Sequence, residues 1–394
     1  MQNKNFSKTK NLSLTPVIPE NVALPGLYIH VPFCISKCPY CGFYSITDLS
    51  LISDYLSALS REMDFSKNRA ETFDTFYIGG GTPSVLSPRQ IEKLILDARN
   101  AFNISEDAEI TIEMNPADIS PALCGTLYGA GVNRVSIGIQ SFDDEVLAFL
   151  GRRHRSAIAA DAIKTVRKAG FENISIDLLY GVPGQDIKVW TETLQQAVAF
   201  NPDHISCYQL TAEKGTLLAQ DIQSGLIALP DEALQAKFFF VTAEILEKCG
   251  YAQYEVSNFS VPGREARHNQ KYWMHVPYLG LGPSAHSFSV GERRWNVRSV
   301  HSYIVKLTEG NLPLEETEIL DSEKMRMETL FLGLRTSGGI SLNKFKTLFD
   351  FDLMQEKKDV IDSLMAEGFV TISDGFLKPT TKGLAVADSL ALIF

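Results

Sequence analysis

Short apolar runs and longer amphipathic segments alternate along most of this chain. Six runs have the length and composition of buried strands, at residues 27–31, 75–78, 109–113, 134–139, 173–178 and 204–209. Helices are expected between them, at residues 53–64, 88–100, 121–128, 143–150, 156–168 and 188–199; in the second of these, Ile91, Leu94, Ile95 and Ala98 form a helical stripe. Strands that alternate with helices indicate a parallel sheet with right-handed crossovers. The pattern predicts an α/β fold, an open or partial (β/α)6 TIM-like barrel.

The pattern changes towards the C-terminus. From residue 321 onward, short helices are expected at residues 323–334, 342–348 and 355–367, followed by β-like pieces at 370–372 and 376–379. We therefore expect four regions: a polar N-terminal extension at 1–20, a barrel core at 21–230, a connecting region at 231–320 that carries a histidine and aromatic motif, and a small α+β domain at 321–394.

Composition narrows the classes of function. A content of 45% hydrophobic and 21% charged residues is ordinary for a soluble globular protein, and the net charge of −10 argues against a nucleic-acid partner. No apolar run approaches the length that crosses a bilayer, and residues 1–20 lack the apolar core of a signal peptide. Cys124, Cys207 and Cys249 are scattered among apolar neighbours, so we expect free thiols and a cytoplasmic location.

Three further cysteines are clustered directly after the first expected strand. Cys34, Cys38 and Cys41 have the spacing Cys-x3-Cys-x2-Cys, and no second Cys-x-x-Cys occurs in the chain. Thiolates favour iron–sulfur clusters, zinc or copper(I), but a structural zinc site normally takes four protein ligands. Three ligands would leave one corner of a four-iron cluster open to a small molecule. Zinc, or a chance grouping of cysteines, is the alternative.

Polar residues and glycines also follow the other expected strands. A glycine run, Gly79 to Gly81, follows the second strand; Glu113, Gln140 and Asp177 lie at or near the ends of the third, fourth and fifth. In a parallel barrel, chemistry gathers at the C-terminal ends of the strands. We therefore expect these residues and the cysteines to meet at one rim.

The cysteine segment, within Tyr28-x-His-x-Pro-Phe-Cys34, resembles the radical S-adenosylmethionine (SAM) superfamily, in particular the branch of oxygen-independent coproporphyrinogen oxidase and related haem chaperones. The resemblance covers about residues 26–290. It implies that Cys34, Cys38 and Cys41 hold a [4Fe–4S] cluster whose open iron binds SAM. It also implies a winged-helix-like C-terminal domain. The residues that it places around SAM and the cluster are Tyr28, Tyr40, Gly80, Gly81, Thr82, Glu113, Gln140, Arg152 and Asp177.

A second motif, His268-Asn-x-x-Tyr272-Trp273, lies in an expected loop beyond the barrel. Imidazole is a common ligand of haem iron, and large aromatic rings pack on porphyrin faces. A histidine beside aromatic residues is, in an arbitrary protein, more often a packed residue. The motif resembles the one associated with haem binding in the chaperones, which implies that His268, Tyr272 and Trp273 bind haem. His275 and His286 are competing ligands.

Two functions compete. One is an enzyme, an oxygen-independent coproporphyrinogen III oxidase; the other is a carrier that binds haem and passes it to an acceptor. The resemblance distinguishes the enzyme from the carrier at position 43, where the decarboxylating enzymes have a fourth cysteine and this chain has Phe43. We favour the haem chaperone and assign no catalytic residue. Its expected partners are a haem donor, a haem-accepting protein and an electron donor for the cluster, with peripheral membrane contact only through the acceptor.

Overall fold

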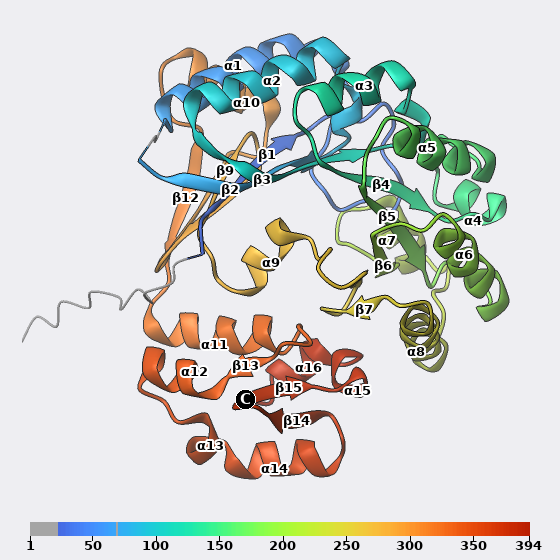
Figure 1. Cartoon of the computed structure of the whole chain (residues 1–394), viewed down its shortest axis with the longest axis vertical. Coiled ribbons are helices and arrows are strands. Elements are labelled where there is room, and N and C mark those ends of the chain that lie inside the picture. The colour runs from blue at the N-terminus through green and yellow to red at the C-terminus, as the bar shows by residue number, and fades with distance from the viewer. Residues whose placement is uncertain (1–22, 68–69) are drawn as a thin grey trace, which may run out of the picture.

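The computed structural model describes residues 23–67 and 70–394, so the extension expected at residues 1–20 lies outside the described part. Its centre is one large sheet, in which the first six strands are parallel and lie side by side in chain order. They are β1 (Gly26–Val31), β2 (Thr72–Gly80), β3 (Asn103–Met114), β4 (Arg134–Gln140), β5 (Asn173–Tyr180) and β6 (His204–Gln209). The sheet curves into an open arc (Figure 1), which confirms the predicted partial (β/α)6 barrel.

Helices connect these strands and cover the outer, convex face of the arc (Figure 1). They are α1 (Ile52–Phe65), α2 (Pro88–Ala101), α3 (Pro121–Gly129), α4 (Asp144–Phe149), α5 (Ser156–Lys168) and α6 (Ile187–Ala199). Helix α2 shows why they form where the pattern predicts: Ser87 and Gln90 make a reciprocal capping box, Pro88 occupies the first turn, and Ile91, Leu94 and Ile95 are buried. Apolar stripes of this kind join the apolar strand residues in one core.

Residues beyond β6 extend the same sheet at both edges, which the sequence pattern did not predict. The strands β7 (Ala252–Gln253) and β8 (Asn258–Ser260) follow β6 at one edge. At the other edge, β9 (Tyr278–Leu281) pairs in parallel with β1. Outside β9 lie β10 (His286–Ser289), β11 (Glu292–Asn296) and β12 (Leu314–Ile319), all antiparallel. The helices of this part are α7 (Leu217–Gln223), α8 (Glu232–Lys248) and α10 (Val300–Thr308).

The histidine and aromatic motif is a helix, α9 (Arg267–Trp273), and not the loop that we expected. It lies on the concave side of the arc, where it contacts β2 (Figure 1). The backbone N–H groups of Arg267 and His268 at its first turn donate to the Glu109 carboxylate at 3.1 and 3.0 Å. A carboxylate at this end satisfies free N–H groups and the helix dipole, so β3 supplies the cap that makes this short polar segment helical.

The C-terminal part has its own small core and a small antiparallel sheet, which confirms the predicted α+β character; the sheet has a third strand, β13 (Ile340–Ser341), that the sequence pattern did not predict. Its elements are α11 (Ser322–Gly333), β13 (Ile340–Ser341), α12 (Leu342–Phe349), α13 (Leu353–Glu356), α14 (Lys358–Ala366), β14 (Val370–Ser373), β15 (Phe376–Pro379), α15 (Thr381–Leu384) and α16 (Ala387–Ala391). The helix expected at 355–367 is two helices, separated at Lys357. Helix α11 contacts α9. The exact boundaries of the four regions stay a prediction.

In the described part of the chain, no helix combines the length and the apolar character needed to span a bilayer.

Candidate functional site

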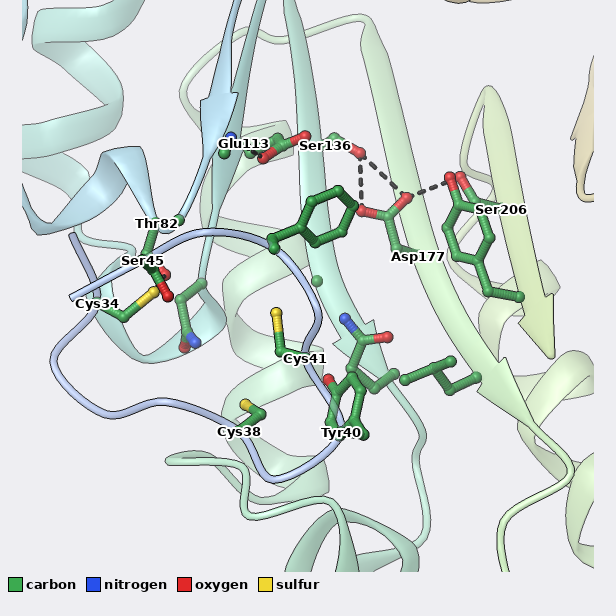
Figure 2. Close-up of a pocket in the computed structure, with 18 of the residues that line it drawn as sticks. Cys34, Cys38, Tyr40, Cys41, Ser45, Thr82, Glu113, Ser136, Asp177 and Ser206 are labelled. Atoms are coloured by element: carbon green, nitrogen blue, oxygen red, sulfur yellow. Dashed lines mark hydrogen bonds between the residues drawn. The ribbon is translucent and has the colours of Figure 1, made fainter. Parts of the chain in front are cut away.

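A cavity of about 700 Å³ opens at the C-terminal ends of the parallel strands. This volume is within the range of small-molecule sites. The structure brings together most of the residues that the sequence predicted at this rim, as Figure 2 shows for several of them. The expected residues that line the cavity are Cys34, Cys38, Tyr40, Cys41, Gly80, Gly81, Thr82, Glu113, Gln140, Arg152 and Asp177.

The three cysteines lie on one loop after β1 and face the strands (Figure 2). All three are free thiols that are partly buried. The loop is fixed at both ends, because Cys34 N–H donates to Ile46 O at 3.0 Å and Ile46 N–H donates to Pro32 O at 2.8 Å. Burial raises the pKa of the Cys41 thiol, and the two neighbouring thiols raise it further.

The donor set fits an iron–sulfur cluster. Within residues 23–67 and 70–394, no three side chains of His, Cys, Asp or Glu are placed to hold one metal ion together. In a four-iron cluster each thiolate binds a different iron, so its ligands need not converge on one point. Arg152 Nη1 donates to Cys38 Sγ at 3.5 Å, and the Thr82 hydroxyl lies 3.3 Å from Cys34 Sγ. These contacts place donors beside sulfurs that would carry negative charge.

The glycine run holds the cysteine loop closely against β2. Gly81 N–H donates to Val31 O and Thr82 N–H donates to Phe33 O, both at 2.8 Å. A side chain on Gly81 would place its Cβ 2.7 Å from Phe33 O, and Gly80 has a φ of 110°. Both positions therefore need glycine. The glycine run therefore lets the backbone of β2 lie directly against the cysteine loop. It also allows a ligand in the cavity to approach this backbone closely.

Glu113 presents a partly buried carboxyl group to the cavity. The Tyr77 hydroxyl donates to Oε1 at 2.7 Å, and the Gly80 N–H donates to Oε2 at 3.0 Å. Burial raises the pKa of Glu113 to about 7, with the Asp177 carboxylate contributing in the same direction. A carboxyl group with a raised pKa gains from a cationic partner. Glu113 can therefore receive the amino group of a bound amino acid moiety.

Asp177 is held by two serines that sequence reasoning missed. Ser136 Oγ lies 3.1 and 3.0 Å from its two carboxylate oxygens, and Ser206 Oγ donates to Oδ1 at 2.7 Å (Figure 2). Burial raises the pKa of Asp177. Buried Arg134 also lines the cavity. The signal that could have found these residues is the repeat of polar side chains at every second position of β4, β5 and β6, since such positions share one face of a sheet.

A second cavity, of about 480 Å³, also borders the cysteine loop. Gly42 and Phe43 line both cavities, so the two residues directly after Cys41 form a shared wall. Phe43 is 70% exposed. Tyr28 lines this second cavity and not the first one. The full lining is Tyr28, His30, Gly42, Phe43, Tyr44, Tyr272, Tyr278, Ser284, His286 and Arg298.

The three residues of the expected haem motif are placed differently from one another. Tyr272 lines the second cavity, whereas His268 and Trp273 line neither. His268 is only 1% exposed, with Nδ1 2.8 Å from Thr75 Oγ1 and Nε2 2.9 Å from the Tyr272 hydroxyl. Burial lowers its pKa to about 3. Trp273 packs under the Arg335 guanidinium of the C-terminal part, 5.5 Å from the ring centre.

Comparisons with known proteins identify the family of this chain. Residues 28–197 match the radical SAM superfamily, and residues 320–386 match the HemN C-terminal domain. The heme chaperone HemW of Bacillus subtilis is 35% identical over 365 residues, which cover 91% of this chain and 96% of that protein. The mitochondrial radical S-adenosyl methionine domain-containing protein 1 of Bos taurus is 32% identical over 93% of this chain and 86% of that protein.

Among solved structures, coproporphyrinogen III oxidase (HemN) of Escherichia coli, described as a radical SAM enzyme, has a similar fold. Its TM-score is 0.82 at 24% sequence identity, and the match covers 94% of this chain and 89% of that one. At this identity the likeness concerns the fold alone.

Proposed function

Because the chain belongs to the radical SAM superfamily and, within it, to the family of the haem chaperone HemW, we propose that it binds haem and transfers it to an acceptor protein. The observation that carries this proposal is the match over nearly the whole chain to relatives named heme chaperones. The aromatic second cavity beside the cysteine loop supports it. A haem donor, a haem-accepting protein and an electron donor are the partners that this function requires.

The first cavity would hold the cofactors. Cys34, Cys38 and Cys41 would bind three irons of a [4Fe–4S] cluster and leave the fourth for SAM. Glu113 would receive the SAM amino group, while Tyr40, Gly80, Gly81, Thr82, Gln140, Arg152 and Asp177 would surround the rest of the molecule. When bound, these groups supply radical chemistry, for which the protein provides position and electrostatics.

The motif of α9 would contribute to haem binding through its tyrosine. Tyr272 presents its ring to the second cavity, and His268 fixes that ring by a hydrogen bond to its hydroxyl. Trp273 anchors the end of the same helix against the C-terminal part. Replacing His268 would therefore loosen a wall of the cavity, even though its own ring lies outside it.

The test is a titration of anaerobically purified, cluster-loaded protein with haemin. We expect about one haem per chain, a Soret band distinct from that of free haemin, and transfer of this haem to apomyoglobin as a surrogate acceptor. His268→Ala should lower the occupancy. His301→Ala, which changes an exposed histidine on α10, is the matched control and should not.

The competing enzymatic function is tested with the same preparation. With coproporphyrinogen III, SAM and a reductant, the chaperone should form no divinyl product. A native preparation that binds no haem, or one that produces protoporphyrinogen in stoichiometric amount, would refute the proposed function.

A further inference from the structure

The second cavity has the size and lining of a site for a flat aromatic ligand. Its volume of about 480 Å³ lies within the range of small-molecule sites. Four tyrosines, Tyr28, Tyr44, Tyr272 and Tyr278, line it together with Phe43. Their rings come from β1, the cysteine loop, α9 and β9, so segments far apart in the sequence build one aromatic chamber. Aromatic rings bury large areas against a planar ligand.

Two histidines line this cavity, and only one of them is free to bind a metal. His30 is 5% exposed, and its ring nitrogens lie 3.0 Å from the Tyr28 hydroxyl and 2.9 Å from Tyr44 O. His286 is exposed on β10, where its ring stacks on Trp295 with centroids 5.5 Å apart. Among the residues that the structure describes, neither ring nitrogen of His286 has a hydrogen-bond partner. Partial burial, followed by the charge of Arg293, lowers the pKa of His286, which favours the neutral imidazole that binds metal ions.

The other two histidines considered as ligands of the haem iron already have hydrogen-bond partners at both ring nitrogens. His268 lines neither cavity and bonds through both ring nitrogens. His275 has its ring nitrogens 3.2 Å from Glu328 Oε2 and 3.2 Å from Thr329 Oγ1. A ring nitrogen must give up its partner to bind iron, and leaving a buried partner unsatisfied costs about 1–3 kcal/mol. His286 carries no such cost.

Arg298 supplies a cation at the same cavity. Its guanidinium lies over the Tyr44 ring at 5.4 Å, and it is exposed. It forms no ion pair with any carboxylate of the described residues. An unpaired arginine at an aromatic cavity is suited to a carboxylate of the ligand, because the guanidinium binds such groups in a bidentate manner.

Resting on the proposed function, we propose that the second cavity is the haem site, with His286 as the axial ligand of the iron and Arg298 as the partner of a propionate. The tyrosines and Phe43 pack around the porphyrin. His268 is then a positioning residue: it lies outside the cavity and fixes Tyr272, which lines the cavity, by a hydrogen bond to the tyrosine hydroxyl. Because Gly42 and Phe43 also line the first cavity, the cargo and the cofactors share this wall.

The experiment compares His286→Ala, His286→Gln, Arg298→Gln and the control His301→Ala, all as cluster-loaded full-length protein titrated with haemin. Iron and sulfide content shows which variants retain the first site. The readouts are the affinity, the Soret maximum and the ferric electron paramagnetic resonance spectrum, which reports the axial ligand.

Both His286 variants should lose the imidazole signature and bind haem at least tenfold more weakly, and free imidazole should restore the native spectrum. Arg298→Gln should weaken binding several-fold with the native spectrum unchanged. His301→Ala should behave as native.

A native spectrum and affinity in both His286 variants would overturn the inference while the chaperone function stands. Loss of the imidazole signature in His268→Ala with an intact His286 would overturn it in favour of His268. If native protein binds no haem, the proposed function itself fails. This result is distinct from the two outcomes above, in which haem binds but His286 is not its ligand.

Discussion

Replacing Glu113 with glutamine should change how stability depends on pH. The carboxyl group is partly buried at the cavity beside the cysteine loop, and burial raises its pKa from the ordinary value of 4.5 to about 7. The folded protein therefore holds this proton over a pH range in which the unfolded chain has released it. Glutamine has nearly the same shape and no proton to release.

The direction and size of this change in stability follow from the difference in the Glu113 pKa between the folded and unfolded states. A group whose pKa is higher in the folded state contributes stability that is complete below pH 4.5 and is lost as the pH rises towards 7. When the pKa differs by one between the folded and unfolded states, the free energy of unfolding changes by about 1.4 kcal/mol, so a rise from 4.5 to about 7 corresponds to a loss of about 3 kcal/mol. Glutamine would avoid that loss, but it weakens the bonds from Tyr77 and Gly80 by about 1–2 kcal/mol. The variant should thus be slightly less stable than native protein at pH 5 and about 1–2 kcal/mol more stable at pH 8.

The assay is urea unfolding of cluster-loaded protein without SAM, followed by circular dichroism at pH 5, 6, 7 and 8. The shallower pH dependence should appear in Glu113→Gln and not in Glu247→Gln, a control on the exposed surface of α8. SAM affinity should fall in the Glu113 variant, and in native protein it should fall about tenfold per pH unit below 7. If the native protein and the Glu113 variant show the same pH slope, the Glu113 carboxyl group does not hold a proton in the folded protein and the reasoning is refuted.

Three further results are expected. Gly81→Ala should lower the iron content and the unfolding midpoint, since the new methyl meets backbone atoms of the cysteine loop that cannot rotate away; Gly125→Ala, with open space around it, should leave both unchanged or gain up to about 1 kcal/mol. Cys34→Ala should abolish the sulfur-to-iron absorption, whereas the exposed Cys249→Ala should retain it, and the reverse result would contradict the three-ligand cluster. Phe43→Cys should yield no divinyl product from coproporphyrinogen III; appearance of that product would mean that this one side chain separates the two functions.

The parallel strands could be predicted because each has a strong local signal. In β1, Leu27, Ile29 and Val31 are fully buried in the core below the helices, while Tyr28 and His30 line the second cavity on the opposite face. The chemistry at the strand ends was predictable for the same reason. Once the strands are parallel, the residues after their C-terminal ends must share one rim.

The edges of the sheet could not be predicted, because their strands have no such signal. β11 and β12 are Glu292–Asn296 and Leu314–Ile319, two mostly polar segments at the outer edge. Their pairing depends on neighbours that are distant in sequence, since β9 joins β1 across some 250 residues. Helix α9 has only seven residues, and its cap comes from Glu109 on another strand. Tertiary contacts, which a local sequence pattern does not contain, therefore determine the outer edge strands, the pairing of β9 with β1 and the formation of α9.

Positions 42 and 43 differ in how tightly the structure constrains them. A Cβ on Gly42 would lie 3.1 Å from the Cβ and Cγ of Glu213, which is a tight contact. The Glu213 side chain is exposed and can move by a few tenths of an ångström, so packing favours glycine at position 42 without requiring it. Phe43 is 70% exposed and lines both cavities, so packing constrains this position less and its side chain is the one that can follow function.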